Sequence, residues 1–345
     1  MKILLLVDRG NSGGKFLAVM EDVESAPFKI PSVTRKVDSV KNGIKIEKSG
    51  SIYLCGDTAL SKAEGIRYTP LDENDKIRDL SVAVAAALIQ LVPNGGPIEL
   101  SLAVSSPIFY QGIEKEIEKE MSRLDNGFSY NDIKYSVLLE RVGGFQEGVI
   151  FLENNRDFNG VIDLGQGTLL AGVRYPDDRG VVTLPLSDSD IGGCNLILQS
   201  LLKDDKFLKA VKKARFTAAP SFEKLSSLLS RGKWEVRDID FKKFLKPHLK
   251  IHKQRIENAA QSIRSEIRNA TSFDQSSEVR IALIGGGSSL LQGVLGESLT
   301  KWCDSHNLVL YKENPDYQTV IQMYEALKQD DTRLVRIPAP AVADV

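Results

Sequence analysis

The sequence predicts an α/β protein with two related lobes, each built from a mixed sheet and flanking helices. The chain has 345 residues, a length that suits two domains of ordinary size. An apolar strand followed by Asp and a glycine-rich turn occurs twice, at residues 3–19 and at residues 160–173. Elsewhere, segments with apolar residues at helical spacing alternate with short apolar strands. The repeated strand–turn–strand pattern therefore favours two related lobes.

The first half of the chain predicts strands and helices in turn. Residues 3–7 and 16–19 are expected to form a hairpin around the first glycine-rich turn, because Pro27 and Pro31 follow too soon for a helix. Residues 79–91 are alanine-rich with apolar residues at helical spacing, so they predict a helix. The other expected elements are strands at 52–55 and 98–104, a helix at 112–124 and a hairpin of 128–130 with 134–142.

The second half begins with the hairpin at residues 160–173 and continues into a mostly helical region at 195–269, with a linker expected near 234–241. A strand at 279–284 and a helix at 316–328 complete the regular structure. The expected division is a first lobe of 1–159 plus 310–335, a second lobe of 160–309 and a flexible tail of 336–345.

The overall charge argues against two classes of partner. The chain has 45 Lys and Arg and 46 Asp and Glu residues, a formal net charge of -1. Direct binding to nucleic acid or to a membrane surface usually needs a clear basic excess, so neither is expected. Local basic runs at 209–213 and 242–243 are interpreted as solvated helix faces.

Cysteine usage indicates a reducing compartment. Cys55, Cys194 and Cys303 lie far apart and lack CxxC spacing. They predict neither a disulfide framework nor a zinc site, and they suit the cytoplasm. The apolar run at the N-terminus reaches Asp8 too soon for a signal peptide. No uninterrupted apolar stretch approaches about 20 residues, so no transmembrane helix is expected.

Three glycine-rich loops, each directly after an apolar strand, predict phosphate binding. Phosphate oxygens need close backbone N–H donors, and glycine allows both the close approach and a positive φ. One such loop is usually a structural turn, whereas three in one chain favour a nucleotide site. The predicted binding residues are Gly10, Asn11, Ser12, Gly13, Gly14, Lys15, Gly165, Gln166, Gly167, Thr168, Gly285, Gly286, Gly287 and Ser288.

Two aspartates, Asp8 and Asp163, stand at strand ends just before the first two loops. Magnesium prefers oxygen ligands and binds through one or two carboxylates together with phosphates and waters. The two carboxylates are therefore predicted to face each other across a cleft and hold Mg²⁺, while Lys15 neutralises phosphate charge. The alternative is that each Asp only opens a turn, as Asp often does.

These motifs resemble those of the actin, heat-shock chaperone and sugar-kinase superfamily. VDRGNSGGK resembles its first phosphate loop, GVIDLGQGT its second and IALIGGGSSLL its adenosine motif. The resemblance is closest to the bacterial actin-like plasmid-segregation proteins of the ParM/StbA type, on residues 52–57, 103–107, 130–142 and 314–317. Ser106 replaces the Leu of that group, and Gln318-Thr319 replace its Ala-Asn. The last change leaves the interdomain role of that element open.

The resemblance implies an actin-like ATPase fold that binds Mg-ATP between its lobes. It assigns the water-orienting role in hydrolysis to Glu147, in a segment similar to the family's FPEG turn, with Glu140 in reserve if the preceding strand ends at Leu139. Asp8 and Asp163 are the implied catalytic carboxylates that hold the metal.

The resemblance also implies filaments that depend on nucleotide, for plasmid DNA segregation or intracellular positioning. The partners would be further copies of the chain and an adaptor protein that links the filament to DNA or another cargo. Gly192 lies in a segment similar to the family's DxGG turn, which borders the nucleotide or the hinge.

Two other functions stay open. One is a small-molecule (sugar-type) kinase of the same fold, with Asp188 or Asp190 as the catalytic carboxylate. The other is an ATP-regulated scaffold that does not polymerise, suggested by the departures at Gln146, Gln318 and Thr319. The sequence specifies neither the cargo nor a preference for ATP over GTP.

Overall fold

The chain divides into two compact units. The first comprises Met1–Gln146 and Val320–Val345, and the second comprises Glu147–Thr319. The computed structural model describes residues 1–10, 13–61, 66–68, 76–107, 110–175, 180–187, 192–215, 220–270 and 279–338. Both units contain a mixed sheet with flanking helices, as the sequence predicts.

The unit boundaries fall at 146/147 and 319/320 rather than at the expected 159/160 and 309/310. Helix α4 (Val149–Asn154) explains the first difference. Its Phe151 and Leu152 are buried in one cluster with Ala282 and Ile284 of the second sheet. The helix therefore buries its apolar side against the second unit, which a reading of the local sequence does not show.

The first unit is built on a sheet of twelve strands, which run in the order β3-β2-β1-β9-β11-β10-β6-β7-β5-β8, with β4 on β2 and β19 on β11. Strands β1, β9 and β11 are parallel neighbours, so their carboxyl ends share one edge of the sheet. The strands are β1 (Lys2–Arg9), β2 (Gly13–Met20), β3 (Val23–Glu24), β4 (Phe28–Pro31), β5 (Thr34–Val37), β6 (Ile44–Ile46), β7 (Ser51–Cys55), β8 (Ile66–Tyr68), β9 (Gly96–Ser106), β10 (Phe128–Tyr130), β11 (Ile133–Gln146) and β19 (Val335–Arg336).

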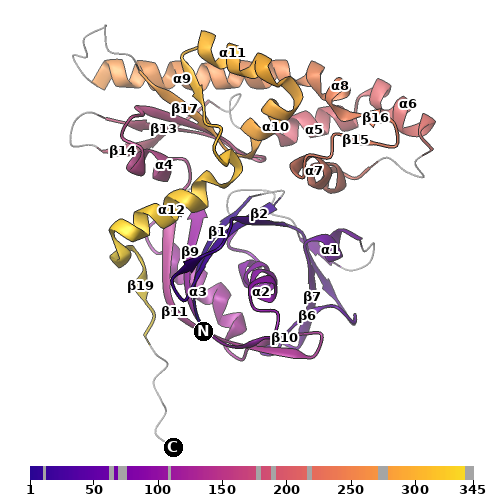
Figure 1. The fold of residues 1–345 in the computed structure, drawn as a ribbon, viewed down its shortest axis with the longest axis vertical. Helices are drawn as coiled ribbons and strands as arrows, with labels where there is room; N and C mark the ends of the chain where they lie inside the picture. The colour runs from indigo at the N-terminus through magenta and orange to yellow at the C-terminus, as the bar shows by residue number, and fades with distance from the viewer. Residues whose placement is uncertain are drawn as a thin grey trace, which may run out of the picture. The chain divides into compact units, whose positions relative to one another are not determined.

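Helix α2 (Leu80–Leu91) is the centre of the first unit, and nine consecutive residues from Leu80 to Leu88 are buried. Figure 1 looks along this helix and shows the strands of the first unit curving around it. A helix that is apolar on all sides suits such an enclosed position, and its alanines let the surrounding strands approach closely. The predicted helix at 79–91 is confirmed.

The other helical segments of the first unit, with their bounds, are α1 (Asp57–Ser61), α3 (Ile113–Met121), η2 (Ser122–Leu124), α12 (Gln318–Gln329) and η5 (Asp331–Arg333). Helix α12 crosses the division, since its first two residues belong to the second unit. The predicted helices at 112–124 and 316–328 are both present, each with a short 3₁₀ turn at one end.

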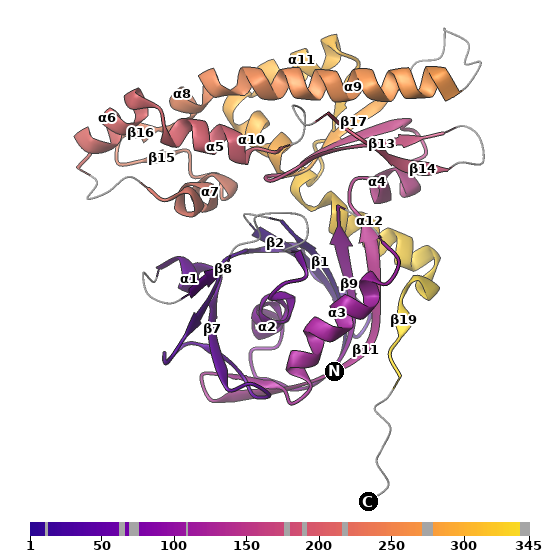
Figure 2. The same cartoon turned by 180° about the vertical axis from the view of Figure 1, so that it is seen from behind.

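The second unit has a five-stranded sheet in the order β14-β13-β12-β17-β18. Alternate residues of β12 face opposite sides: Ile162 belongs to the cluster that contains α9, and Val161 to the cluster that contains α4. Figure 2 shows α9 and α4 on the two sides of this sheet. The strands are β12 (Gly160–Leu164), β13 (Leu169–Arg174), β14 (Val181–Leu184), β17 (Ile281–Ile284) and β18 (Leu308–Leu310).

Helices make up most of the remaining second unit, as predicted. The expected linker near 234–241 is instead a hairpin, because Arg237 and Asp238 both adopt a positive φ and close a tight turn. The elements are α5 (Asn195–Leu202), α6 (Asp205–Lys213), α7 (Phe222–Ser230), β15 (Glu235–Val236), β16 (Ile239–Asp240), α8 (Phe241–Leu245), η3 (Lys246–Leu249), α9 (Lys250–Ala270), α10 (Gly286–Leu295), α11 (Glu297–Ser305) and η4 (Pro315–Tyr317).

The expected flexible tail of 336–345 is wrong at its start. Val335 and Arg336 pair with β11, and the Ile337 N–H donates to the Glu140 carbonyl at 2.8 Å. Backbone hydrogen bonds to the sheet therefore hold the chain through Ile337. Residues 339–345 lie outside the described part of the chain. Across the described residues, no helix combines the length and apolar character needed to cross a membrane.

His252 gives the second unit a testable pH dependence. It is 0% exposed, and neither of its ring nitrogens has a hydrogen-bond partner among the residues that the structure describes. Burial, assisted by the charge of Arg255, lowers the pKa of His252 to about 4. Between that value and the ordinary pKa near 6.5, the unfolded chain binds a proton that the folded chain does not. The free energy of unfolding should therefore decrease as the pH falls through this window, by up to about 3 kcal/mol.

Urea denaturation at pH 7 and pH 5 measures this effect. The decrease should be smaller in His252→Leu, because an uncharged side chain has no proton to bind. The same pH dependence in both proteins would contradict the assignment to His252.

Candidate functional site

The carboxyl edge of the first sheet carries a buried, ion-paired carboxylate. Asp8, near the end of β1, is 3% exposed. Its Oδ2 lies 2.6 Å from the Lys15 Nζ, and its Oδ1 lies 3.6 Å from the Lys76 Nζ. The Ser105 hydroxyl donates to Oδ1 at 3.1 Å. Ser105 is on β9, so the parallel pairing of β1 and β9 brings it to the same edge as Asp8.

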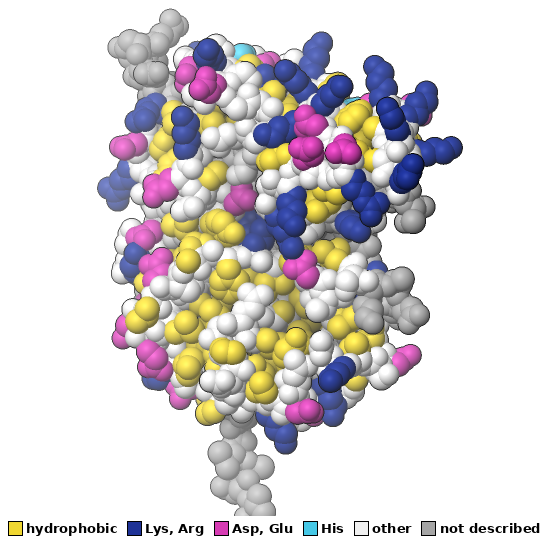
Figure 3. All heavy atoms as spheres, turned by 45° about the vertical axis from the view of Figure 1, so that its right-hand side comes forward, with side chains coloured by type: hydrophobic (Ala, Val, Ile, Leu, Met, Phe, Trp, Pro, Cys, Tyr) yellow, Lys and Arg dark blue, Asp and Glu magenta, His cyan; other side chains and the backbone are white. Residues whose placement is uncertain are grey.

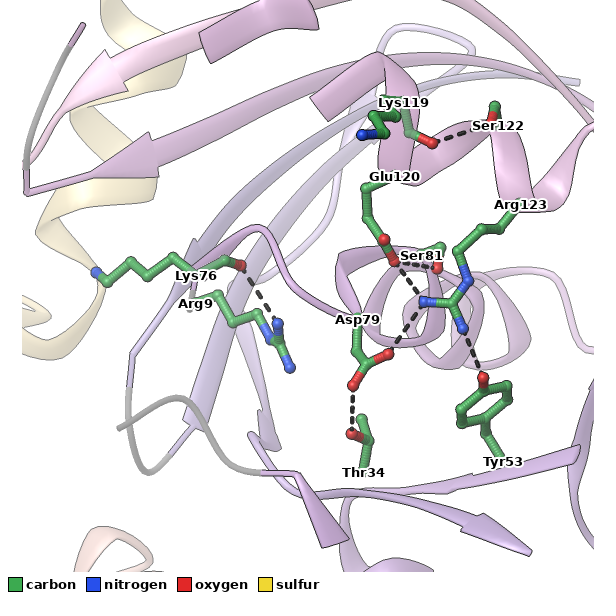
Figure 4. A network of polar contacts seen from close by, with 10 residues as sticks. All are labelled: Arg9, Thr34, Tyr53, Lys76, Asp79, Ser81, Lys119, Glu120, Ser122 and Arg123. Carbon is green, nitrogen blue, oxygen red and sulfur yellow. Dashed lines mark hydrogen bonds and ion pairs between the residues drawn. The ribbon is translucent and has the colours of Figure 1, made fainter. Parts of the chain in front are cut away.

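The charge of Asp8 is stabilised by these partners. Burial by itself would raise the pKa of this carboxyl, but Lys15 and Lys76, with the hydrogen bonds from Lys15 and Ser105, hold the pKa well below its usual range. Lys76 is held in turn through its backbone, since Arg9 donates to the Lys76 carbonyl at 3.3 Å (Figure 4). Both neighbours are buried, Arg9 at 1% and Lys76 at 6% exposure.

The first predicted loop is the turn between β1 and β2. Asp8 pairs with Lys15 and Arg9 with Gly14, so the register places the Asp and Lys side by side on neighbouring strands. The Gly10 N–H donates to both the Asp8 and Gly13 carbonyls at 3.2 Å. The predicted residues Asn11 and Ser12 lie outside the described part of the chain.

Strand β11 ends at the same edge as Asp8. It runs without a break in the sheet to Gln146, which pairs with Ser106 of β9, although its register shifts between Leu139 and Arg141. Glu140 sits at this irregularity in mid-strand, so the strand does not end at Leu139 and the reason for holding Glu140 in reserve fails. The residue that follows the strand is Glu147.

In the second unit, the Glu147-Gly148 turn lies beside Asp163. Glu147 is buried at 5% exposure and Asp163 at 8%. A Cβ atom placed on Gly148, which has φ +70°, would lie 3.6 Å from the Asp163 Cβ. The structure therefore brings two of the predicted catalytic residues, Glu147 and Asp163, into one neighbourhood.

Asp163 is also met by the third glycine-rich loop. Its strand β12 is parallel to β17, with Asp163 opposite Ile284, so Gly285 follows at the same edge. A Cβ on Gly285 would lie 2.2 Å from the Asp163 Oδ1 and 2.6 Å from the Leu164 carbonyl oxygen. Gly285 has φ +92° and ψ 167°, a conformation that essentially only glycine adopts. Only glycine fits this position without displacing the carboxylate.

The second predicted loop, residues 165–168, packs against the segment that contains Gly192 and Gly193. The Gly193 N–H donates to the Gly167 carbonyl at 3.0 Å, and the Asn195 N–H to the Gln166 carbonyl at 2.7 Å. A Cβ on Gly193 would lie 2.4 Å from the Gly165 carbonyl oxygen. These contacts hold the Gly192-Gly193 turn against the second loop.

The remaining residues of the third loop begin a helix. Gly286, Gly287 and Ser288 form the first turn of α10, so their N–H groups lie at a helix N-terminus, where backbone donors and the helix dipole favour an anion. The Ser288 hydroxyl donates to the Gly285 carbonyl at 2.7 Å. A Cβ on Gly287 would lie 2.7 Å from the Cys194 Sγ, which joins this turn to the start of α5.

Several residues of these clusters escaped the sequence analysis. Asp316 accepts a hydrogen bond from the Ser289 hydroxyl beside the third loop, and Ser226 accepts one from the Gln166 side chain. Lys76 and Ser105 complete the surroundings of Asp8. Ser105 directly follows the predicted strand at 98–104, a signal that could have been used. Lys76 follows a polar stretch without a motif.

The chemistry of these donors fits nucleotide phosphates and Mg²⁺. The glycines of the three loops leave backbone amides without shielding side chains, and Lys15 supplies a cation. These glycines are residues 10, 13, 14, 165, 167 and 285–287. Buried carboxylates accompany these loops, Asp8 in the first unit and Glu147 and Asp163 in the second, and the described residues contain no group of three or more potential metal ligands. Such a set suits Mg²⁺ held largely by phosphates and waters. Asp8 already pairs with Lys15, so direct metal contact there would have to replace that ion pair.

No protein-family model and no curated protein sequence matches this chain. Several solved structures are similar to it. The archaeal actin homolog Ta0583 has 15% identity and a TM-score of 0.63, over 95% of this chain and 100% of that chain. The actin-like protein Alp7A has 13% identity and a TM-score of 0.54, over 96% and 99%. Bacillus thuringiensis ParM with ATP has 14% identity and a TM-score of 0.52, over 95% and 99%.

The chain has the actin-like fold. These structures are covered almost from end to end, so the likeness applies to the whole architecture and not to one lobe. In this actin-like chain the three glycine-rich loops follow β1, β12 and β17, each at the carboxyl end of a strand with a parallel neighbour. Ligands of α/β sheets commonly bind at this end of the strands.

The contact between Gly285 and Asp163 predicts the effect of Gly285→Ala. The new methyl group would displace the carboxylate and also strain the backbone, which costs roughly 1–3 kcal/mol. Gly296→Ala is the matched control, because Gly296 has an equally unusual backbone (φ +55°, ψ -136°) with nothing within 4 Å of an added Cβ. Urea denaturation should show a loss for Gly285→Ala that exceeds the control by about 2 kcal/mol or more. Equal losses would show that the contact is unimportant.

Proposed function

We propose that this actin-like protein is an ATPase that binds Mg-ATP and polymerises into filaments controlled by the bound nucleotide. The observation that carries the proposal is the position of Asp163, which is buried at the carboxyl edge of its sheet with Gly148 and Gly285 against it. A carboxylate surrounded by glycine turns leaves room and backbone donors for a phosphate–metal group.

The Asp8 cluster supports the same function in the first unit. Lys15 is only 13% exposed at its side chain and is aligned by Asp8 at 2.6 Å, so it is a preorganised cation for phosphate oxygens. The similar proteins are also consistent with a nucleotide: Ta0583 has been solved with ADP and Bacillus thuringiensis ParM with ATP. We propose that both clusters bind one Mg-ATP.

In this proposal the residues have separate roles. The amides of the three glycine-rich loops and Lys15 bind phosphate, and Asp163 binds the metal directly or through waters. The metal neutralises phosphate charge. Glu147, buried at 5% exposure beside the Gly148 turn, orients the water that attacks the terminal phosphate. The bound nucleotide would favour the conformation that polymerises, and hydrolysis would weaken that preference. An adaptor that connects the filament to plasmid DNA or another cargo, in the cytoplasm, completes the proposal.

Light scattering and pelleting after addition of Mg-ATP test assembly. The wild-type protein at tens of micromolar should assemble, and EDTA should prevent it. Asp163→Ala should bind Mg-ATP at least about tenfold more weakly, the loss expected when a group around a metal is removed, and should not pellet. Asp157→Ala is the control, since Asp157 is an exposed carboxylate of the same unit.

Three results would overturn the proposal in different ways. Wild-type protein that binds Mg-ATP without assembling would be an ATP-regulated scaffold. Phosphate release that requires an added sugar would indicate a kinase. Wild-type protein that binds no nucleotide would remove the ATPase assignment altogether.

The role of Glu147 predicts a separation of binding from hydrolysis. Glu147→Ala should bind Mg-ATP with nearly wild-type affinity and hydrolyse it at least about tenfold more slowly, because the water loses its orienting group. Glu140→Ala should hydrolyse at the wild-type rate, since Glu140 lies in mid-strand. Calorimetry measures the first property and phosphate release the second. A wild-type rate in Glu147→Ala would assign the role to another residue.

A further inference from the structure

The nearly neutral chain contains one strongly basic segment. Residues 203–268 include 18 Lys and Arg against 8 Asp and Glu, a formal charge of +10. The rest of the chain includes 27 Lys and Arg against 38 Asp and Glu, a formal charge of -11. The overall value of -1 therefore conceals two regions of opposite sign.

Tertiary contacts gather much of this segment into one part of the second unit. Phe207 of α6 packs against Phe241 and Phe244 of α8, with ring centroids 6.1 and 5.7 Å apart. Asp204, just before α6, contacts His248 of η3 at 3.3 Å. Helix α6 therefore packs against α8 and η3, although about 30 residues separate them in the chain.

The lysines of these elements point away from the shared core. On α6, Phe207 and Val211 are buried, while the four lysines of the helix are exposed. The same division holds on α8, η3 and the first residue of α9. We call the exposed set the basic face; it consists of Lys206, Lys209, Lys212, Lys213, Lys243, Lys246 and Lys250. On the face drawn in Figure 3, Lys and Arg side chains gather over the second unit, with some Asp and Glu side chains among them.

On α6, α8 and η3, the seven-lysine set has one exposed carboxylate among it, Asp205 in the first turn of α6. No lysine of the set forms an ion pair with any described residue. In the first unit, two exposed lysines do have carboxylate partners, since Lys48 lies 2.9 Å from Asp125 and Lys45 lies 3.6 Å from Glu47. A solvated helix face usually mixes both signs, as α3 does with its alternating Glu and Lys. Seven unpaired cations on one subregion leave a positive potential that suits a polyanion.

We propose that the basic face binds double-stranded nucleic acid through its phosphates. Single strands are usually held by exposed aromatic side chains that stack on bases, whereas Phe207, Phe241 and Phe244 are turned into the core. Membrane surfaces are bound by basic residues together with inserted apolar ones, and among the described residues of 203–268 only Ile251 is a large exposed apolar side chain. Among the described residues, lysines with so few exposed aromatic or apolar neighbours fit a duplex backbone and predict binding without sequence preference.

This inference replaces the expectation, drawn from the overall charge, that the chain does not contact nucleic acid. It is independent of the nucleotide site, because the basic face belongs to α6, α8, η3 and the start of α9 and shares no residue with the glycine-rich loops. It can therefore be tested on protein without ATP or metal.

Fluorescence anisotropy with a labelled duplex of about 30 bp, between 50 and 200 mM salt, provides the test. The wild-type protein should bind the duplex, with an affinity that falls steeply with salt, at a slope of about -0.9 per phosphate contacted. The variant K206Q/K209Q/K212Q/K213Q should bind at least about tenfold more weakly at 50 mM salt and show a flatter salt dependence. The control K36Q/K41Q/K115Q/K134Q removes four exposed lysines of the first unit, and its affinity should stay within about twofold of the wild type.

Circular dichroism melting confirms that both variants are folded. No binding by folded wild-type protein at 50 mM salt and tens of micromolar would overturn the proposal. An equal loss in both variants would show a general charge effect and no specific face. Tighter binding to a single strand of the same length, or to vesicles that contain phosphatidylserine, would assign the basic face to a different ligand.

Discussion

A Cβ atom on Gly285 would stand 2.2 Å from the Asp163 carboxylate, and much of the second unit is arranged around this close approach. Parallel pairing of β12 and β17 brings the two residues together. Helix α10 begins directly after β17, and its Gly287 lies close to the Leu164 carbonyl at the end of β12. The turn at Gly193 is under the same limit on side-chain volume, since a Cβ there would lie 2.4 Å from the Gly165 carbonyl oxygen. At Gly148 the added Cβ would have ordinary contacts, and the positive φ of +70° favours glycine instead.

In the first unit, ion pairs and a hydrogen bond stabilise the buried carboxylate of Asp8. Asp8 is buried, and burying an unpaired carboxylate would cost several kcal/mol. Lys15 faces it across the hairpin, Lys76 approaches from a separate segment, and Ser105 donates from the neighbouring parallel strand. Asp163 lies against the glycine turns at Gly148 and Gly285. The two aspartates look equivalent in sequence but have different surroundings.

The distribution of charge over the surface also depends on tertiary packing. The overall balance of the chain suggests no affinity for polyanions, yet the packing of α6 on α8 and η3 turns a set of unpaired lysines outward from one aromatic core. The number that matters for long-range electrostatics is the charge of a surface and not that of the chain. A nucleotide-driven polymer with a basic face on each copy would present that face repeatedly, so weak contacts to a duplex would act together.

The sequence by itself determined the features that depend on local backbone chemistry. Apolar strands followed by glycine, the alanine-rich helix α2 and the hairpin of 128–130 with 134–142 were predictable because propensity and φ preference act over a few residues. Only the tertiary structure decided which distant residues join them: Lys76 beside Asp8, Asp316 beside the third loop, and α4 on the second sheet. It also turned the expected linker near 234–241 into a hairpin and paired Arg336 with β11. Contacts of this kind depend on strand register and helix packing between segments far apart in the chain, and no local pattern encodes them.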